Sequence, residues 1–249
     1  MTRHLELEWP DPRPFAGRKG EPIRLLAVSD ELDPALGHDV NRERLGRIDM
    51  VIGCGDLGAD ELCFLGDAFG VPLIYVLGNH DRGGRWAQSA PRLPTPLARF
   101  STELGLGFVG LSWPGHDRPG LHARRDERAA WVDVARVVVR LAIRRLTGRA
   151  APVLVVSHAP PRGLGDGPDA YHRGFAGYRW LVERLRPPVW LHGHTNPAST
   201  ERRDVRAGPT RLVNVTGSVL IELRPPSQRG SAPAGTSAGP AGQRPEPGR

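Results

Sequence analysis

Two features that would place a chain in a membrane or in a disulfide-stabilised scaffold are nearly missing from this sequence. Its 249 residues include only two cysteines, Cys54 and Cys63, which are too few for a disulfide framework. The longest apolar stretch, near residues 134–143, is interrupted by Arg136 and Arg140 and is too short to span a bilayer. The opening residues have no apolar core of signal-peptide length. We therefore expect a cytoplasmic protein with reduced thiols and no membrane partner.

Lysine is also scarce. Lys19 is the only one, so arginine supplies nearly all of the 34 basic residues and the formal net charge of +7. With 31 glycines and 25 prolines, this skew is more typical of a genome composition bias than of a basic face built for a partner. No basic run interleaved with aromatics and no zinc-finger or RNA-binding signature is present. Nucleic acid is therefore expected only as a substrate.

Composition divides the chain into three sections. Residues 1–20 are polar and rich in proline, and we expect a loosely tied leader there. Residues 21–225 carry all the periodic apolar segments and are long enough for one α/β domain with a substantial core. Residues 226–249 are rich in Gly, Pro and Ser and poor in large apolar residues, so we expect a disordered tail.

The middle section alternates between strand-like and helix-like segments. Helices are expected at about 59–69, 125–146 and 174–186, and segments 212–215 and 219–223 are expected to form a closing hairpin. Short apolar runs between helices are typical of parallel strands in βαβ units. The five runs expected to form these strands are residues 23–28, 50–54, 72–77, 153–156 and 189–191.

Each of these five runs ends in Asp, Asn or His. The residues concerned are Asp30, Asp56, Asn79, His158, and His192 with His194. Because ligands of open α/β sheets bind beyond the carboxyl ends of the strands, we expect these side chains to meet at one edge. Carboxylates mixed with imidazoles suit Mn, Fe, Zn or Ni better than calcium.

Taken singly, most of these residues have a structural explanation. An Asp after a strand is more often a helix cap or a turn residue, and Gly78-Asn79 is a common turn pair. His158 precedes two prolines and fits a solvated loop. His192-Gly193-His194 is harder to explain in this way, because Gly lets the backbone approach closely and both imidazoles can face one side. The coincidence of all five at strand ends favours a metal site.

These blocks resemble the signature of the calcineurin-like metallophosphoesterases. The family pattern is Asp-x-His, Gly-Asp, Gly-Asn-His-Asp or Glu, a lone His, and Gly-His-x-His. Residues 158–175 resemble a bacterial branch with no assigned substrate. The resemblance covers about residues 23–223, and the matching segments are Asp30-Glu31-Leu32, Gly55-Asp56, Gly78-Asn79-His80-Asp81, His158 and His192-Gly193-His194.

The resemblance implies a two-sheet α/β sandwich flanked by helices, with two divalent metals. Asp56 would bridge the metals and Asp30 with His194 would hold one of them. The other metal would be completed by Asn79, His158 and His192. His80 would assist the leaving group without binding metal, and would be held in place by Asp81.

Elementary chemistry supports such a site. Two metals about 3.5–4 Å apart can hold both a hydroxide and the phosphate oxygens, and a metal lowers the pKa of water to about 7. One block departs from the family, because Leu32 stands where the pattern has His. Glu31 and Asp33 have the wrong strand parity to replace it, so we expect the Asp30/His194 metal to bind more weakly.

Three function classes remain open at this stage. The first is hydrolysis of phosphomonoesters or phosphodiesters of a small substrate, the second is a nuclease with the same chemistry, and the third is a non-catalytic scaffold with a partial site. Retention of His80 and Asp81 favours catalysis, while Leu32 favours the scaffold. Asp166, Asp169 and His172 are candidate substrate-binding residues.

Overall fold

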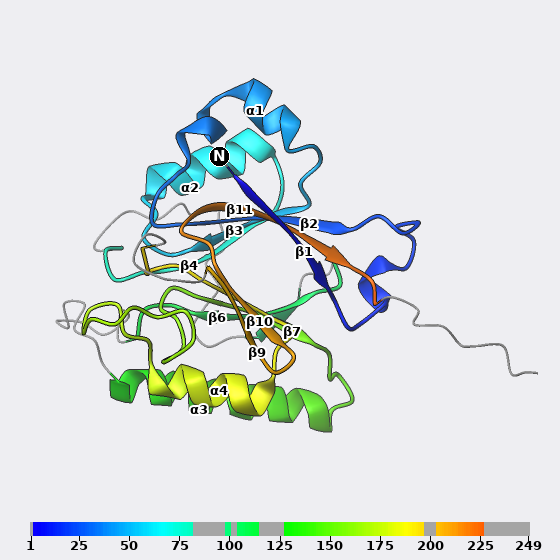
Figure 1. Ribbon diagram of the computed structural model, residues 1–249. Coiled ribbons are helices and arrows are strands. Elements are labelled where there is room, and N and C mark those ends of the chain that lie inside the picture. The colour runs from blue at the N-terminus through cyan, green and yellow to red at the C-terminus, as the bar shows by residue number, and fades with distance from the viewer. Residues whose placement is uncertain (1, 82–97, 101–103, 115–126, 197–202, 227–249) are drawn as a thin grey trace, which may run out of the picture.

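Two β-sheets lie face to face between two pairs of helices, giving the four layers seen in Figure 1. The computed structural model describes residues 2–81, 98–100, 104–114, 127–196 and 203–226. The first sheet has the strand order β1-β11-β2-β3-β4 and the second has the order β5-β6-β7-β8-β10-β9. This arrangement confirms the expected two-sheet α/β sandwich flanked by helices.

The first sheet is built from β1 (Arg3–Glu8), β2 (Ile23–Ser29), β3 (Met50–Cys54), β4 (Leu73–Val76) and β11 (Gly217–Arg224). Strands β2, β3 and β4 are parallel neighbours, whereas β11 runs antiparallel to β2. Two helices cover the outer face, α1 (Asp39–Arg44) and α2 (Ala59–Phe69). Short 3-10 helices lie at η1 (Arg13–Phe15) and η2 (Pro34–Gly37).

The second sheet contains the short β5 (Ala98–Phe100), β6 (Gly107–Leu111), β7 (Val153–Ser157), β8 (Val189–His192), β9 (Asp204–Ala207) and β10 (Thr210–Asn214). Strands β6, β7, β8 and β10 are parallel along this order. Its outer face is covered by α3 (Glu127–Leu146) and α4 (Ala176–Leu185), which lie side by side in Figure 1. The expected βαβ alternation is therefore confirmed within the described residues.

The central strands read as continuous apolar runs because both of their faces are buried. In β2, Leu25 and Ala27 pack into the core between the sheets, while Leu26 and Val28 pack in the cluster beneath α2. Strand β7 behaves in the same way: Leu154 enters the inter-sheet core and its neighbours pack under α3 and α4. These strands therefore form a rigid base for whatever follows their carboxyl ends.

The structure differs from the leader expected over residues 1–20. Residues 3–8 form β1, which pairs in parallel with β11, and Trp9 is buried in the inter-sheet core with Leu7 and Phe15. In this segment charged residues alternate with leucine, as is typical of an edge strand. Their number made the segment resemble a polar leader in composition. The expected tail lies outside the described residues, apart from Pro226.

The expected closing hairpin is wrong. Strand β10 pairs with β8 and β9 in the second sheet, whereas β11 pairs with β2 and β1 in the first. The chain changes sheets over Val215 and Thr216: Val215 N–H donates to the His192 carbonyl (2.8 Å), while Thr216 forms a bridge with Ser29. Strand β11 is buried on both faces, and an interior strand of this kind can pair with elements far away in sequence.

Candidate metal centre

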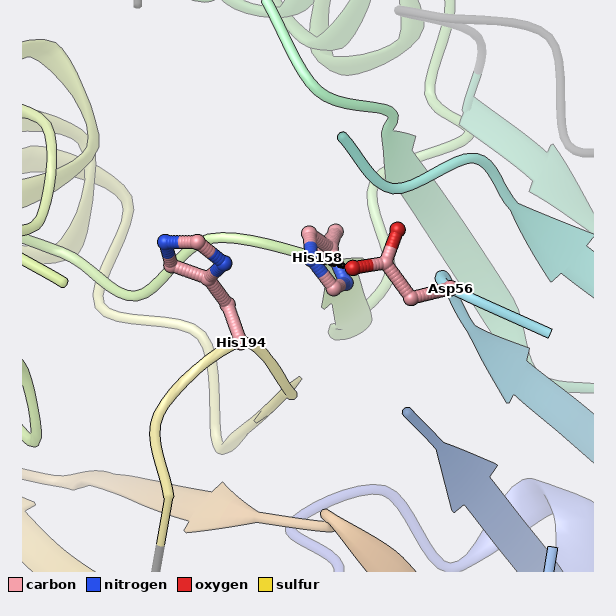
Figure 2. A group of neighbouring side chains, drawn as sticks. All are labelled: Asp56, His158 and His194. Carbon is pink, nitrogen blue, oxygen red and sulfur yellow. Dashed lines mark ion pairs between the residues drawn. The ribbon is translucent and has the colours of Figure 1, made fainter. Parts of the chain in front are cut away.

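Three side chains from the carboxyl ends of three strands meet between the sheets. Asp56 follows β3, His158 follows β7 and His194 follows β8, and each offers a ligand atom within 4.8 Å of the other two. In Figure 2 the ring of His158 lies between Asp56 and His194. His158 is fully buried and His194 is nearly so, which suits imidazoles that bind a metal rather than water.

The backbone is strained where these residues lie. Asp30, Asp56 and His194 have positive φ angles of 63°, 53° and 65°, which side chains other than glycine rarely adopt. Each such residue costs on the order of 1–3 kcal/mol and persists only where its surroundings enforce it. Three of the five positive-φ residues other than glycine in the described chain thus belong to this site. Such clustering is typical of a functional site.

Glycines allow the loops to approach one another closely. A Cβ at Gly78 would lie 2.1 Å from Oδ1 of Asp56, and a Cβ at Gly55 would lie 2.5 Å from Nδ1 of His158. A Cβ at Gly193 would lie 1.9 Å from the Ser29 hydroxyl. The Gly-Asp, Gly-Asn and His-Gly-His blocks therefore need their glycines for packing of the loops against the ligands.

Asp56 and His158 form the electrostatic centre of the site. Nε2 of His158 lies 3.1 Å from Oδ2 of Asp56, and Nδ1 lies 2.9 Å from the Cys54 carbonyl oxygen. Burial alone would lower the pKa of His158, but the hydrogen bond and charge of Asp56 raise it to about 9. Burial would likewise raise the pKa of Asp56, but His158 holds it below its usual value. Each group therefore stabilises the charged form of the other.

Asn79 joins this group through its amide. Its Oδ1 lies 2.9 Å from Nε2 of His158, and its Nδ2 donates to the Tyr171 hydroxyl at 2.6 Å. The side chain is almost completely buried, so its oxygen faces the same space as the carboxylate of Asp56. An amide oxygen, a carboxylate and two imidazoles together form a donor set suited to a transition metal.

Asp30 and His192 lie beside this group, on neighbouring loops. Both carboxylate oxygens of Asp30 accept from the His194 backbone N–H, at 3.2 and 3.1 Å, and Thr216 donates to one of them at 3.0 Å. His192 is buried with Nδ1 3.0 Å from the Gly193 carbonyl, and its Nε2 faces Gly165. Burial lowers the pKa of His192 to about 4, so the ring is neutral and able to act as a ligand.

His80 projects toward solvent at the edge of the site. Its backbone N–H donates to Oδ1 of Asp56 at 2.7 Å, and its Nε2 lies 2.8 Å from the Tyr171 hydroxyl. Asp81 is buried beneath the loop, where its Oδ2 accepts from the N–H groups of Gly78 (2.6 Å) and Asp56 (2.8 Å). These bonds of Asp81 hold the two metal-site loops together. The orientation of His80 by Asp81 that the resemblance implies stays a prediction.

Tyr171 is a site residue that the sequence reasoning did not find. Its hydroxyl meets both Asn79 and His80, and its carbonyl oxygen lies 3.0 Å from Nε2 of His194. No motif spacing marks a tyrosine in a loop. The only available signal was its position between Asp169 and His172, which were already candidates for substrate binding.

The three candidate substrate residues have different surroundings. His172 lines the site pocket, with its ring centroid 5.4 Å from that of His194. Asp169 accepts from His172 Nδ1 at 2.8 Å, and this hydrogen bond lowers the pKa of Asp169 to about 2. Asp166 accepts from the N–H groups of Gly163 and Gly174, both at 2.9 Å. The two aspartates therefore shape the loop that carries Tyr171 and His172.

The segment around Leu32 corrects the parity argument. Strand β2 ends at Ser29, and Asp30 turns the chain into the left-handed region, so residues 31–33 do not alternate as a strand. Leu32 is partly buried against the hydrophobic cluster beneath α2, and Glu31 is exposed. Asp33 caps η2 by accepting from the Ala35 N–H at 3.0 Å. Its carboxylate is therefore engaged in local structure.

A pocket of about 610 Å³ opens over the site. Its lining combines side chains of the metal site with Arg3 of β1 and with residues 216–218, where β11 begins. Arg3 and Arg203 line it, and burial together with the charge of Arg203 lowers the pKa of Arg3. Among the lining residues, Asp30, Asp56 and His194 belong to the metal site, and His80, Tyr171 and His172 lie beside it.

Residues 23–197 match the model of the calcineurin-like phosphoesterase family, which spans well over half of the chain. The chain belongs to this family. Membership implies metal-dependent hydrolysis of phosphoesters, and members of the family typically bind divalent metals; Asp56, His158 and His194 form a candidate site for them. No curated protein matches the sequence. No helix in the described part of the chain has the length and apolarity needed to cross a bilayer.

TT1561 and vacuolar protein sorting 29 are among the solved structures that the protein resembles. TT1561 of Thermus thermophilus has 14% identity and a TM-score of 0.51, covering 79% of this chain and 90% of its own. Vacuolar protein sorting 29 from Cryptosporidium parvum has 12% identity and a TM-score of 0.40, covering 79% of this chain and 75% of its own. At this identity, the similarity to TT1561 reflects the shared fold.

Proposed function

We propose that the protein hydrolyses phosphoester bonds of a small phosphorylated substrate, either a monoester or a diester. The observation that carries this proposal is the group formed by Asp56, His158 and His194, of which Asp56 and His194 line a pocket of about 610 Å³. That volume lies within the range of about 300–1,000 Å³ typical of small-molecule sites. It therefore favours a small ester over a strand of nucleic acid, and we infer a nuclease only as the second candidate.

The donor set fits divalent transition metals. Asp56, Asn79, His158 and His192 would hold one metal, and Asp30 with His194 and Asp56 would hold the second, more weakly because Leu32 supplies no imidazole. Bound metals supply positive charge that activates water near neutral pH and offsets the charge of the phosphate. Manganese, iron, zinc and nickel all suit these ligands.

The protein's own side chains would act on the substrate around this centre. His80 is exposed in the pocket, and we assign it the protonation of the leaving oxygen, with Tyr171 holding its Nε2. Arg3 and Arg203 carry positive charge on the pocket wall, where they would meet the anionic part of the substrate. This arrangement of His80 and Tyr171 beside the metal site favours catalysis over a non-catalytic scaffold.

The proposal is tested by assaying protein with defined metal content against phosphomonoesters, phosphodiesters, cyclic nucleotides and single-stranded nucleic acid. We expect hydrolysis of an activated ester to vanish with chelator and to return with manganese or another transition metal. Asp56→Asn should remain inactive with every metal, while Asp60→Asn, on the exposed start of α2, should behave as the wild type. Undiminished activity in fully demetallated protein, or no hydrolysis of any ester by metal-loaded protein, would overturn the proposal.

A further inference from the structure

A second concave surface lies at the opposite end of the second sheet from the metal site. It is a groove of about 980 Å³ between the C-terminal parts of α3 and α4 and the segments that lead into β7 and β8. Its lining includes Pro152 and Pro188, which precede those strands, whereas His158 and His192 lie at the strands' other ends. We call it the α3–α4 groove. Its position leaves the phosphoesterase pocket accessible.

The floor of the α3–α4 groove is apolar. Leu141, Trp180 and Leu185 line it as partly buried residues that pack against the core beneath the two helices. Rigid prolines form much of the remaining wall, which keeps the groove open without a ligand. A hollow of this kind is suited to apolar side chains supplied from outside.

Helix α3 continues this apolar surface along its outer face. The outer stripe consists of Val132, Val139, Ile143 and Leu146, exposed to 39%, 57%, 54% and 87%. Spacings of 7, 4 and 3 residues place these side chains on one face of a helix. From Val132 to Leu146 the stripe runs for about 21 Å, or about four helical turns. Single exposed apolar residues are normal, but a stripe adjoining an apolar groove indicates a contact surface.

The groove is also strongly basic. Among its described lining residues, Glu8 is the only acidic one, and five are arginines: Arg144, Arg145, Arg149, Arg184 and Arg186. Burial and the nearby charge of Arg149 lower the pKa of Arg144, so these guanidinium groups repel each other. The five arginines form the charged rim of the groove. Arg184 stacks over the Trp180 ring at 5.6 Å and so connects this rim with the apolar floor. Carboxylates placed over the rim would relieve this repulsion.

We propose that the α3–α4 groove and the outer stripe together dock an acidic amphipathic helix of a partner protein. Leucine-like side chains on one face of that helix would fill the groove and cover the stripe, and glutamates along its edges would meet the arginines. A helix of about four turns matches the length of the outer stripe. The proposal does not depend on the phosphoesterase activity.

The same observations disfavour other occupants. In a two-fold contact between copies of this chain, each arginine rim would face the other, which costs binding energy. A flat membrane surface would cover the outer stripe but leave the groove unfilled. A small anionic amphiphile would fill the groove but leave the stripe exposed. An extended acidic helix matches the hollow, the stripe and the charge together.

The test uses the full chain and a fluorescent acidic peptide of about 18 residues, with leucines at helical i, i+3, i+4 spacing and glutamates elsewhere. The control peptide has the same composition with its leucines spread around the helix. We expect the amphipathic peptide to bind at least about tenfold more tightly than the control. Hydrogen exchange should slow in residues 132–149 when it binds.

Surface variants separate the contributions of charge and apolar contact. Arg145→Glu with Arg149→Glu should weaken peptide binding about tenfold, and the uncharged replacements Ile143→Asn with Leu146→Asn should do the same. Arg44→Glu on α1, with half of that charge change, should have no effect. All of these residues are exposed, so the variants should keep the wild-type melting temperature.

Three results would overturn the proposal. Equal binding of the amphipathic and control peptides would remove the role of the helical face. Recruitment to phosphatidylglycerol vesicles that both double variants abolish would identify a membrane surface instead. A concentration-dependent dimer that the Ile143→Asn, Leu146→Asn variant dissociates would identify a second copy of the chain as the occupant.

Discussion

The carboxylate of Asp56 lies 3.1 Å from the imidazole of His158, and the two groups come from different sheets. Strand β3 of the first sheet presents Asp56, while β7 of the second presents His158. The contact therefore joins the two layers of the sandwich at the metal site.

Metal-free protein should lose stability as the pH rises from 6.5 toward 9. Burial opposes protonation of His158, yet Asp56 raises its pKa from 6.5 to about 9. The folded state therefore keeps a proton that the unfolded chain releases, so this stabilisation is full below pH 6.5 and is lost as the pH passes 9. Melting temperatures of chelator-treated protein across this range would measure the effect.

The matched control for this pH dependence is Asp56→Asn, which removes the charge that holds the proton and should flatten the slope. Burial is the main cause that lowers the pKa of His192 to about 4 and that of His194 to about 3. Titration of these two groups therefore changes the stability only below pH 6.5. A melting temperature that rises between pH 6.5 and 9 would contradict the prediction.

His80→Ala should lower turnover by about 10²–10⁴, the range expected for a lost general acid. Bound metal, measured by elemental analysis, should stay nearly unchanged, because the side chain of His80 contacts Tyr171 and solvent. His38→Ala, at an exposed position before α1, is the control and should leave both quantities unaltered. Loss of metal in the His80 variant would make His80 a ligand and refute its assigned role.

Tyr171→Phe tests the hydroxyl that connects Asn79 with His80. The ring remains, but the contacts at 2.6 and 2.8 Å are lost, so we expect turnover to fall by about 10–100-fold. The pH dependence of turnover should also shift, because Nε2 of His80 loses its partner. A variant with wild-type turnover and pH profile would show that Tyr171 only covers the site.

Gly78→Ala should abolish metal binding while leaving the fold intact. The added methyl group would lie 2.1 Å from Oδ1 of Asp56 and 2.6 Å from its backbone nitrogen, so both the carboxylate and its loop have to move. Gly66→Ala on α2 is the control, because no atom lies within 4 Å of its Cβ position, and it should raise stability by about 0.5–1 kcal/mol. Metal content and thermal melts distinguish the two effects. Normal metal binding by the Gly78 variant would show that the loops can separate.

Leu32→His should raise metal content toward two ions per chain, because it restores the imidazole that the family pattern contains. Glu31→Ala should change metal content little, since Glu31 is exposed. Asp33→Ala removes the cap of η2 and should cost about 1 kcal/mol of stability without emptying the site. Loss of metal in either carboxylate variant would show that a carboxylate has taken the place of the missing imidazole.

The sequence predicted the interior of the fold better than its edges. Strands β2, β3, β7 and β8 are buried on both faces, so their apolar runs marked them within a residue or two. Strand β1 escaped notice because an edge strand alternates with charged residues, such as Glu6 beside Leu7. The sequence also did not reveal which strands pair with β10 and β11, because these two strands carry similar apolar patterns but join different sheets.

The site was predicted as far as motif spacing reaches. Asp56, His158 and His194 come together from blocks distant in sequence, because each block follows a parallel strand. Tyr171 and the backbone role of Asp81 depend on loop geometry, which no spacing rule encodes. Strand parity does not apply to Glu31 and Asp33, because β2 ends at Ser29 and Asp30 has a positive φ angle.

The change of sheets at Thr216 has a consequence for the order of folding. Thr216 lies where the chain passes from β10 in the second sheet to β11 in the first, and its hydroxyl donates to Asp30 at 3.0 Å. This passage between the sheets therefore contacts a residue of the metal site. A partly folded chain with only one sheet in place would lack half of the ligands. A metal that binds across both sheets would therefore leave the refolding rate nearly unchanged and would mainly slow unfolding.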